Sequence, residues 1–130
     1  MLRLKAWRSD ANLLRLSRAM GVTCVVAIIV LSLLPGNERP HTGSPGQLEH
    51  AIAYFGTAAF LALGFRATRD RVATISFLIG LAAVMELIQR LIPGRHSQFI
   101  DWFASSLGAG LGVLAVVLTE RLMTLSGESR

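Results

Sequence analysis

The stretch VATISFLIGLAAVMELIQRLI, residues 72–92 of the 130-residue chain, decides the fold. Its only charged residues, Glu86 and Arg90, lie close to its end. About 20 apolar residues in a helix cross the roughly 30 Å hydrocarbon core of a bilayer. Three more apolar stretches, 19–34, 48–65 and 99–118, alternate with segments that contain proline, glycine and most of the charge. The pattern predicts four transmembrane helices in a single domain, residues 1–130.

The composition also favours a membrane protein. Hydrophobic residues make up 52% of the chain and charged residues only 16%, whereas about a quarter of the residues of soluble proteins are charged. The chain has too few polar side chains to cover its own surface, which disfavours a disordered chain and an ordinary soluble enzyme. Cys24 is the only cysteine, so a disulfide scaffold is disfavoured too. We therefore predict an all-α polytopic membrane protein with the lipid bilayer as its surroundings.

The first 18 residues predict a short amphipathic helix on the membrane surface, before the first span. Basic residues alternate there with apolar residues at near-helical spacing. A cleaved signal peptide is the competing interpretation. We disfavour it because the basic region is long and no small-x-small cleavage motif follows the first apolar stretch.

The distribution of Lys and Arg predicts the orientation in the membrane. Ten basic residues fall before the first stretch, between the second and third, or after the fourth, and only Arg39, Arg90 and Arg95 fall on the other side. The positive-inside rule then places both termini in the cytoplasm and loops 35–47 and 93–98 outside a cell membrane. The net charge of +5 comes without the basic stripe of a nucleic-acid-binding protein, so we expect no nucleic-acid partner.

Glu86 is the most informative polar residue, since it lies about 9 Å below the end of its helix. A carboxylate at that depth costs about 2.5–3.5 kcal/mol on insertion scales, so it should face the bundle and find a partner. We predict Arg90, at i+4, as that partner, with the amide of Gln89 beside it. The alternative is an internal ion pair that only holds the helix in the bundle.

Other polar residues should meet Glu86 at the outer ends of the helices. His50 and Tyr54 are four residues apart on one helix face, and a short turn tethers Arg95 near Asp101. His50 could instead be a solvated interfacial histidine, and Asp101 a helix cap. We predict an outward-facing polar pocket, whose candidate catalytic residues are Glu86, His50 and Asp101. Its candidate ligand-binding residues are Arg95, Arg90, Gln89, Tyr54 and Glu49.

Ser105, Gly108 and Gly112 follow Asp101 on one helix face, and their small side chains predict close helix packing. Four helices can satisfy this face within one chain, but dimerisation is an open alternative, so the oligomeric state is not predicted.

We predict neither a cofactor nor a metal. A divalent metal held by Glu49, His50, Glu86, His96 and Asp101 is sterically conceivable, but these residues lack the spacing of a metal-binding motif.

The string Glu86-x-x-Gln89-x-x-x-Pro93-Gly94-Arg95, followed by Asp101, Gly108 and Gly112, resembles the pattern of the VanZ-like family of small bacterial membrane proteins. Leu34-Pro35 and His50-x-x-x-Tyr54 match more weakly. The chain departs from the family at Gly46-Gln47, where an Asp-Lys pair is common, and at Ser105, where Asn is common. The resemblance implies a multi-helix protein of the bacterial envelope, related to a protein that protects against teicoplanin. It implies no agreed reaction.

Three functions are compatible with this pattern. The first is a non-enzymatic factor that binds a lipid-linked envelope component or a glycopeptide through its arginines, which suit phosphate or carboxylate groups. The second is a membrane enzyme that acts on a lipid-linked headgroup, with Glu86 or His50 as general acid or base. The third is a structural or transport accessory protein. The chain contains no nucleophile elbow and no Gly-rich phosphate loop.

Overall fold

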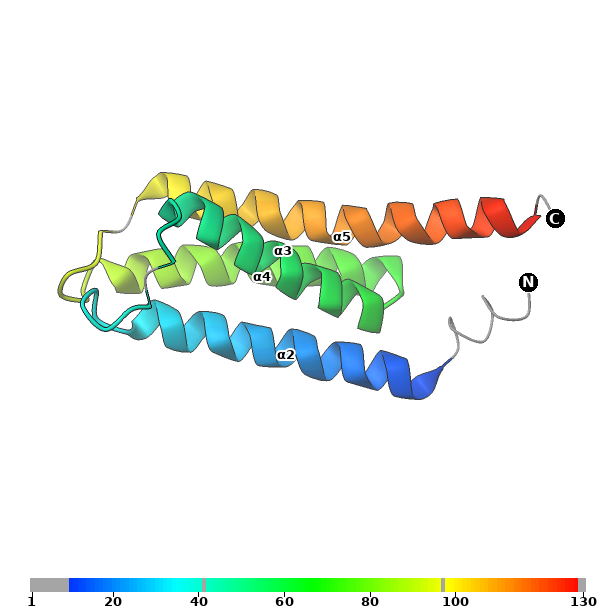
Figure 1. Ribbon diagram of the computed structural model, residues 1–130, viewed down its shortest axis with the longest axis horizontal. Helices are drawn as coiled ribbons and strands as arrows, with labels where there is room; N and C mark the ends of the chain where they lie inside the picture. Colours follow the sequence, from blue (N-terminus) through cyan, green and yellow to red (C-terminus); the bar gives the residue numbers. More distant parts are fainter. Residues whose placement is uncertain (1–9, 41, 97, 129–130) are drawn as a thin grey trace.

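The computed structural model describes residues 10–40, 42–96 and 98–128, which form an antiparallel bundle of four α-helices (Figure 1). The helices are α2 (Ala11–Leu33), α3 (Gly46–Gly64), α4 (Thr68–Gln89) and α5 (Phe99–Glu128). The connections after α2 and α4 lie together at one end of the bundle, which we call the loop end (Figure 1). The α3–α4 connection and both ends of the described chain lie at the opposite, terminal end. The all-α prediction is confirmed.

Three of the four helices are long and apolar enough to cross a membrane: α2, α4 and the segment Phe99–Ser126 of α5. The helix α3 is less apolar because Gln47, Glu49 and His50 occupy its first two turns. Apolar composition therefore supports three spans and not the predicted fourth. The packing gives a physical reason, since α3 makes extensive contacts with both α2 and α5 and so presents less surface of its own to the surroundings.

Large apolar side chains cover the outside of the bundle, while polar side chains lie within it. Leu87 and Phe103, for example, are 58% and 53% exposed. The buried polar residues include Thr57, Gln89 and Ser105. An apolar surface of this extent is unfavourable in water and is satisfied by lipid tails. The structure thus supports association with a lipid bilayer.

The first helix begins earlier than predicted. The Asp10 carboxylate caps α2 by accepting hydrogen bonds from the backbone N–H groups of Asn12 and Leu13, at 2.9 and 3.4 Å. Residues 11–18 therefore belong to the same helix as the apolar residues that follow, and the predicted division at residue 18 is wrong. The hydropathy falls at Arg18, but the helix continues through this residue. The Arg18 side chain donates a hydrogen bond to the Gly64 carbonyl oxygen at 2.8 Å. The rest of the predicted amphipathic helix, residues 1–9, lies outside the described residues.

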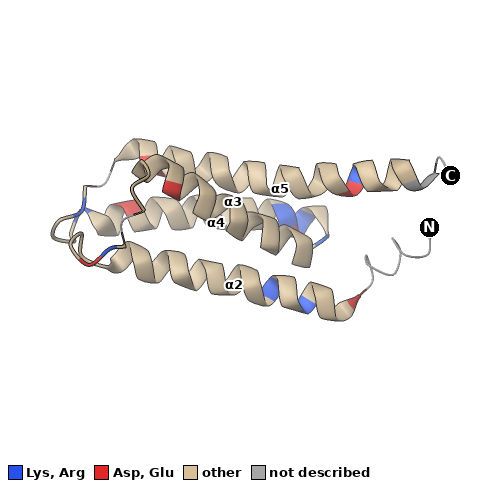
Figure 2. Ribbon diagram, in the orientation of Figure 1, with Lys and Arg blue, Asp and Glu red and all other residues tan. Residues whose placement is uncertain are grey.

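Charged residues lie on neighbouring helices at the terminal end (Figure 2), and three of them form an ion-pair network. Arg71 donates to the Glu120 carboxylate at 3.0 Å and to the Ala62 carbonyl oxygen, and Arg66 also pairs with Glu120. Arg71 and Glu120 lie within α4 and α5, outside the predicted apolar stretches. The apolar stretches 72–92 and 99–118 stop at these charges, but opposite charges that pair can be buried inside a longer helix.

The helices α3 and α5 approach each other closely at two glycines. A Cβ atom at Gly108 would lie 2.3 Å from the Ala51 carbonyl oxygen, and one at Gly112 would lie 2.3 Å from that of Phe55. No side chain fits at these points. The structure therefore places the small-residue face of α5 against α3 of the same chain.

Gly108→Leu should separate α5 from α3, because its side chain would overlap the backbone of Ala51. We expect a loss of at least about 1–3 kcal/mol of stability, the usual cost of overpacking. Thermal unfolding in detergent, followed by size-exclusion chromatography, measures the loss. Gly110→Leu is the matched control, since a Cβ at Gly110 meets open space. Equal melting temperatures for the two variants would contradict this packing.

Glu120→Gln should destabilise the terminal end, because it leaves Arg66 and Arg71 without their shared carboxylate. Breaking a buried pair in this way costs about 3–5 kcal/mol. We expect a lower melting temperature than for Glu38→Gln, which changes an exposed loop carboxylate. If both variants melt like the parent protein, the network does not stabilise the bundle.

Candidate functional site

The loop end is built on two connections that touch each other. The backbone N–H of Gly36 donates to the Pro93 carbonyl oxygen at 3.3 Å. A Cβ atom at Gly36 would lie 2.0 Å from the Gly94 carbonyl oxygen, and Gly94 itself adopts a φ of 73°. Only glycine suits either position. The α2–α3 and α4–α5 connections are thereby held together over the ends of the helices.

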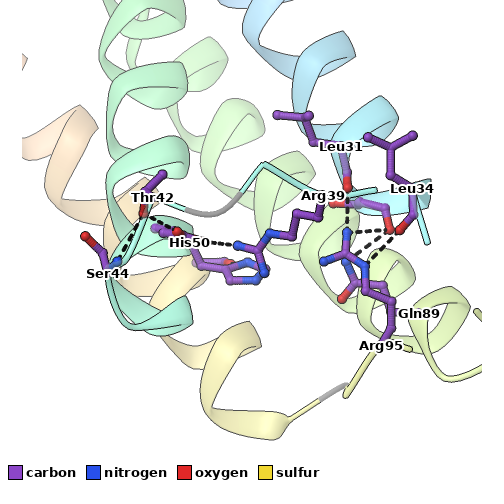
Figure 3. A network of polar contacts seen from close by, with 11 residues as sticks. Leu31, Leu34, Arg39, Thr42, Ser44, His50, Gln89 and Arg95 are labelled. Atoms are coloured by element: carbon purple, nitrogen blue, oxygen red, sulfur yellow. Dashed lines mark hydrogen bonds and ion pairs between the residues drawn. The ribbon is translucent and has the colours of Figure 1, made fainter. Parts of the chain in front are cut away.

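Arg95 binds the end of α2. Its guanidinium group donates to the carbonyl oxygens of Leu34 and Ser32, each at 3.1 Å, and to that of Leu31 (Figure 3). The last carbonyl groups of a helix lack partners within the helix and attract cations. Burial lowers the pKa of Arg95, and the charge of Arg39 lowers it further, yet an arginine keeps its proton in proteins. Arg95 thus joins the α4–α5 connection to α2.

A second arginine lies at the same end. Arg39, in the α2–α3 connection, forms an ion pair with Glu49 of α3, and the Thr42 hydroxyl donates to the same carboxylate (Figure 3). The carboxylate therefore ties the connection to the first turn of α3. Neither Arg39 nor Thr42 is part of a recognisable motif, and sequence analysis did not select them as site residues.

These groups surround a pocket of about 260 Å³, which we call the loop-end pocket. Its polar lining includes Arg39, Glu49, His50, Tyr54, Gln89 and Arg95, and its apolar lining includes Ile28 and Leu31 of α2. Five of the eight residues that sequence analysis selected for the pocket therefore line one cavity. Gln89 also donates to the Ser32 carbonyl oxygen at 3.3 Å, so it holds α4 against α2.

The three candidate catalytic residues lie together beside this pocket. One ligating atom from each of His50, Glu86 and Asp101 lies within 4.8 Å of the others. Glu86 and Asp101 are buried, at 7% and 8% exposure, while His50 also lines the pocket. We call these three residues the carboxylate–histidine cluster. Its three residues come from α3, α4 and α5, so no spacing within one segment of the sequence predicts the cluster.

Ser105 orients the histidine of this cluster. Its hydroxyl donates to the Asp101 carbonyl oxygen at 2.9 Å and lies 3.3 Å from Nδ1 of His50. Because a serine hydroxyl has one proton, Ser105 can satisfy both contacts only if it accepts a hydrogen bond from Nδ1. The arrangement favours the neutral tautomer with its proton on Nδ1 and a lone pair on Nε2. Nε2 is then the ring atom that can accept a proton or bind a cation.

Two predicted residues lie apart from this group. Arg90 directly follows α4, its side chain is exposed, and it is not among the residues that line the loop-end pocket. His96, which we considered as a metal ligand, is exposed as well.

Searches against protein-family models, curated proteins and solved structures find no match to this chain.

Arg95→Lys should weaken the loop end, because an ammonium group cannot reproduce the planar fork of donors that reaches three carbonyl oxygens. We expect a loss of about 1.5–3 kcal/mol, the range for hydrogen bonds to charged groups. Thermal unfolding in detergent measures it, with Arg90→Lys as the matched control on an exposed arginine. An Arg95→Lys protein as stable as the control would show that this contact contributes little.

Proposed function

We propose that the protein is a VanZ-like membrane protein of the bacterial envelope that binds the anionic group of an amphiphile in the loop-end pocket. The amphiphile is a lipid-linked envelope component or a lipoglycopeptide, and binding contributes to resistance of the teicoplanin type. The observation that carries the proposal is the presence of Arg39 and Arg95 in one pocket that is also lined by apolar side chains of α2.

The chemistry of this pocket suits a ligand with two different parts. Guanidinium groups form charge-assisted hydrogen bonds with phosphate and carboxylate groups. Ile28 and Leu31 supply apolar contacts on α2, which has the smallest buried share of the three candidate spans, 17% of its most apolar window. An amphiphile in the surrounding lipid could therefore reach the pocket along α2 while its charged group contacts the arginines.

The orientation of the bundle supports an extracellular ligand. The terminal end carries most of the basic residues, including Arg15, Arg18, Arg66 and Arg69. The positive-inside rule assigns that end to the cytoplasm and the loop end to the outer leaflet of the cell membrane. The resemblance of Glu86-x-x-Gln89, Pro93-Gly94-Arg95 and Asp101 to the VanZ-like pattern is compatible with this orientation.

Arg39→Gln should weaken binding of an anionic amphiphile about tenfold, which corresponds to the loss of one charge-assisted hydrogen bond. The purified protein in neutral phosphatidylcholine nanodiscs is titrated separately with teicoplanin and with a short-chain phosphatidylglycerol, and affinity is measured by thermophoresis. The two titrations distinguish a glycopeptide ligand from a lipid ligand.

Arg90→Gln is the matched control, because it removes an arginine from the same end of the bundle but outside the pocket. In cells, expression of the parent protein and of Arg90→Gln should raise the inhibitory concentration of teicoplanin, and Arg39→Gln should not. The proposal fails if neither probe binds the parent protein, or if both variants lose affinity equally.

The carboxylate–histidine cluster favours a second candidate, a membrane enzyme that acts on a lipid-linked headgroup. Glu86 or His50 would serve as general acid or base, and Asp101 would orient its neighbour. His50 connects the cluster to the pocket, where a headgroup would bind. Turnover of a labelled lipid-linked precursor by the parent protein, with loss in Glu86→Gln, is the result that distinguishes this candidate from a binding protein.

A further inference from the structure

The buried Asp101 carboxylate lacks a complete set of hydrogen-bond partners among the described residues. Its side chain is only 8% exposed, and among the described residues its Oδ1 atom has no hydrogen-bond partner. A buried carboxylate oxygen without a donor or a cation is costly. A positively charged ligand would supply the missing partner of the Asp101 Oδ1 atom.

The other members of the carboxylate–histidine cluster are suitable partners for such a ligand. Two carboxylates and one imidazole offer ligating atoms within 4.8 Å of one another. Ligands at about 2.0–2.2 Å from a central ion lie at most about 4.4 Å apart, so small side-chain rotations bring the three atoms onto one ion. At this end, Arg39 pairs with Glu49 and Arg95 donates to carbonyl groups of α2.

We propose that His50, Glu86 and Asp101 bind a divalent first-row metal ion of the Zn²⁺ class. Imidazole nitrogen favours Zn²⁺ and its neighbours over Mg²⁺ and Ca²⁺, which prefer sites built from oxygen alone. Ser105 acts as the positioning residue, since its contact with Nδ1 leaves Nε2 of His50 to bind the ion. Three protein ligands leave one tetrahedral position open, and His50 directs that side of the cluster toward the loop-end pocket.

The test measures metal directly and needs no knowledge of the amphiphile, so it does not depend on the proposed function. The full chain, purified with a tag that lacks histidine, is stripped with EDTA, incubated with Zn²⁺ and dialysed. We expect about one Zn²⁺ per chain by mass spectrometry, because the residues that the structure describes contain one such three-residue cluster. We also expect a higher melting temperature with Zn²⁺ than without, because an ion that binds only the folded state stabilises it.

Matched variants locate the ion. Glu86→Gln and His50→Gln should lose the stoichiometric Zn²⁺, while Glu49→Gln and His96→Gln, which alter a carboxylate and a histidine outside the cluster, should retain it. Ser105→Ala should bind Zn²⁺ about tenfold more weakly, the usual effect of losing a residue that orients a ligand. Zn²⁺ retained by Glu86→Gln and His50→Gln, or lost equally by the control variants, would overturn the assignment.

A measurement on the parent protein tests the metal site even if the variants do not fold. The Zn X-ray absorption edge should report one imidazole nitrogen with oxygen ligands and no sulfur. A parent protein that binds no Zn²⁺ after dialysis would overturn the proposal. A spectrum with sulfur ligation would also overturn it, because it would place the ion at Cys24.

Discussion

The contact between the α3 and α5 backbones at Gly108 and Gly112 determines the rest of the loop end. Because no side chain separates the two helices, the residues one and two turns before Gly108 are brought against α3. Ser105 therefore reaches His50, and Asp101 reaches both His50 and Glu86. Polar groups assembled in this way are screened from lipid by the apolar outer faces of the helices. The packing glycines and the functional candidates are thus parts of one helix face.

The fold could be predicted from the sequence to the extent that hydropathy reports it. All four helices were found because each contains a long apolar run. Their bounds were misplaced where charges are buried in pairs, since hydropathy treats Arg71 and Glu120 as helix ends although Glu120 accepts from Arg71 inside the bundle. The composition of α3 is explained by the same principle. A helix covered by its neighbours needs fewer apolar residues than one that faces lipid.

The residues of the candidate site could be predicted better than their roles. The cost of a carboxylate in the membrane pointed to Glu86, and helical spacing pointed to Tyr54 as a neighbour of His50. The partners could not be predicted, because they come from connections. Arg39 belongs to a loop without a motif, and the Arg95 contacts with the end of α2 depend on the fold of the Pro93-Gly94 turn. A loop conformation, unlike a helix, does not produce a periodic pattern in the sequence.

The two ends of the bundle handle buried charge in opposite ways. At the terminal end one carboxylate, Glu120, receives two guanidinium groups, so its charge is compensated by residues that also hold the helices together. At the loop end the guanidinium groups of Arg39 and Arg95 contact other partners, and two buried carboxylates lie beside a histidine. The terminal end therefore places one carboxylate between two guanidinium groups, whereas the loop end places two carboxylates and an imidazole close together beside a pocket.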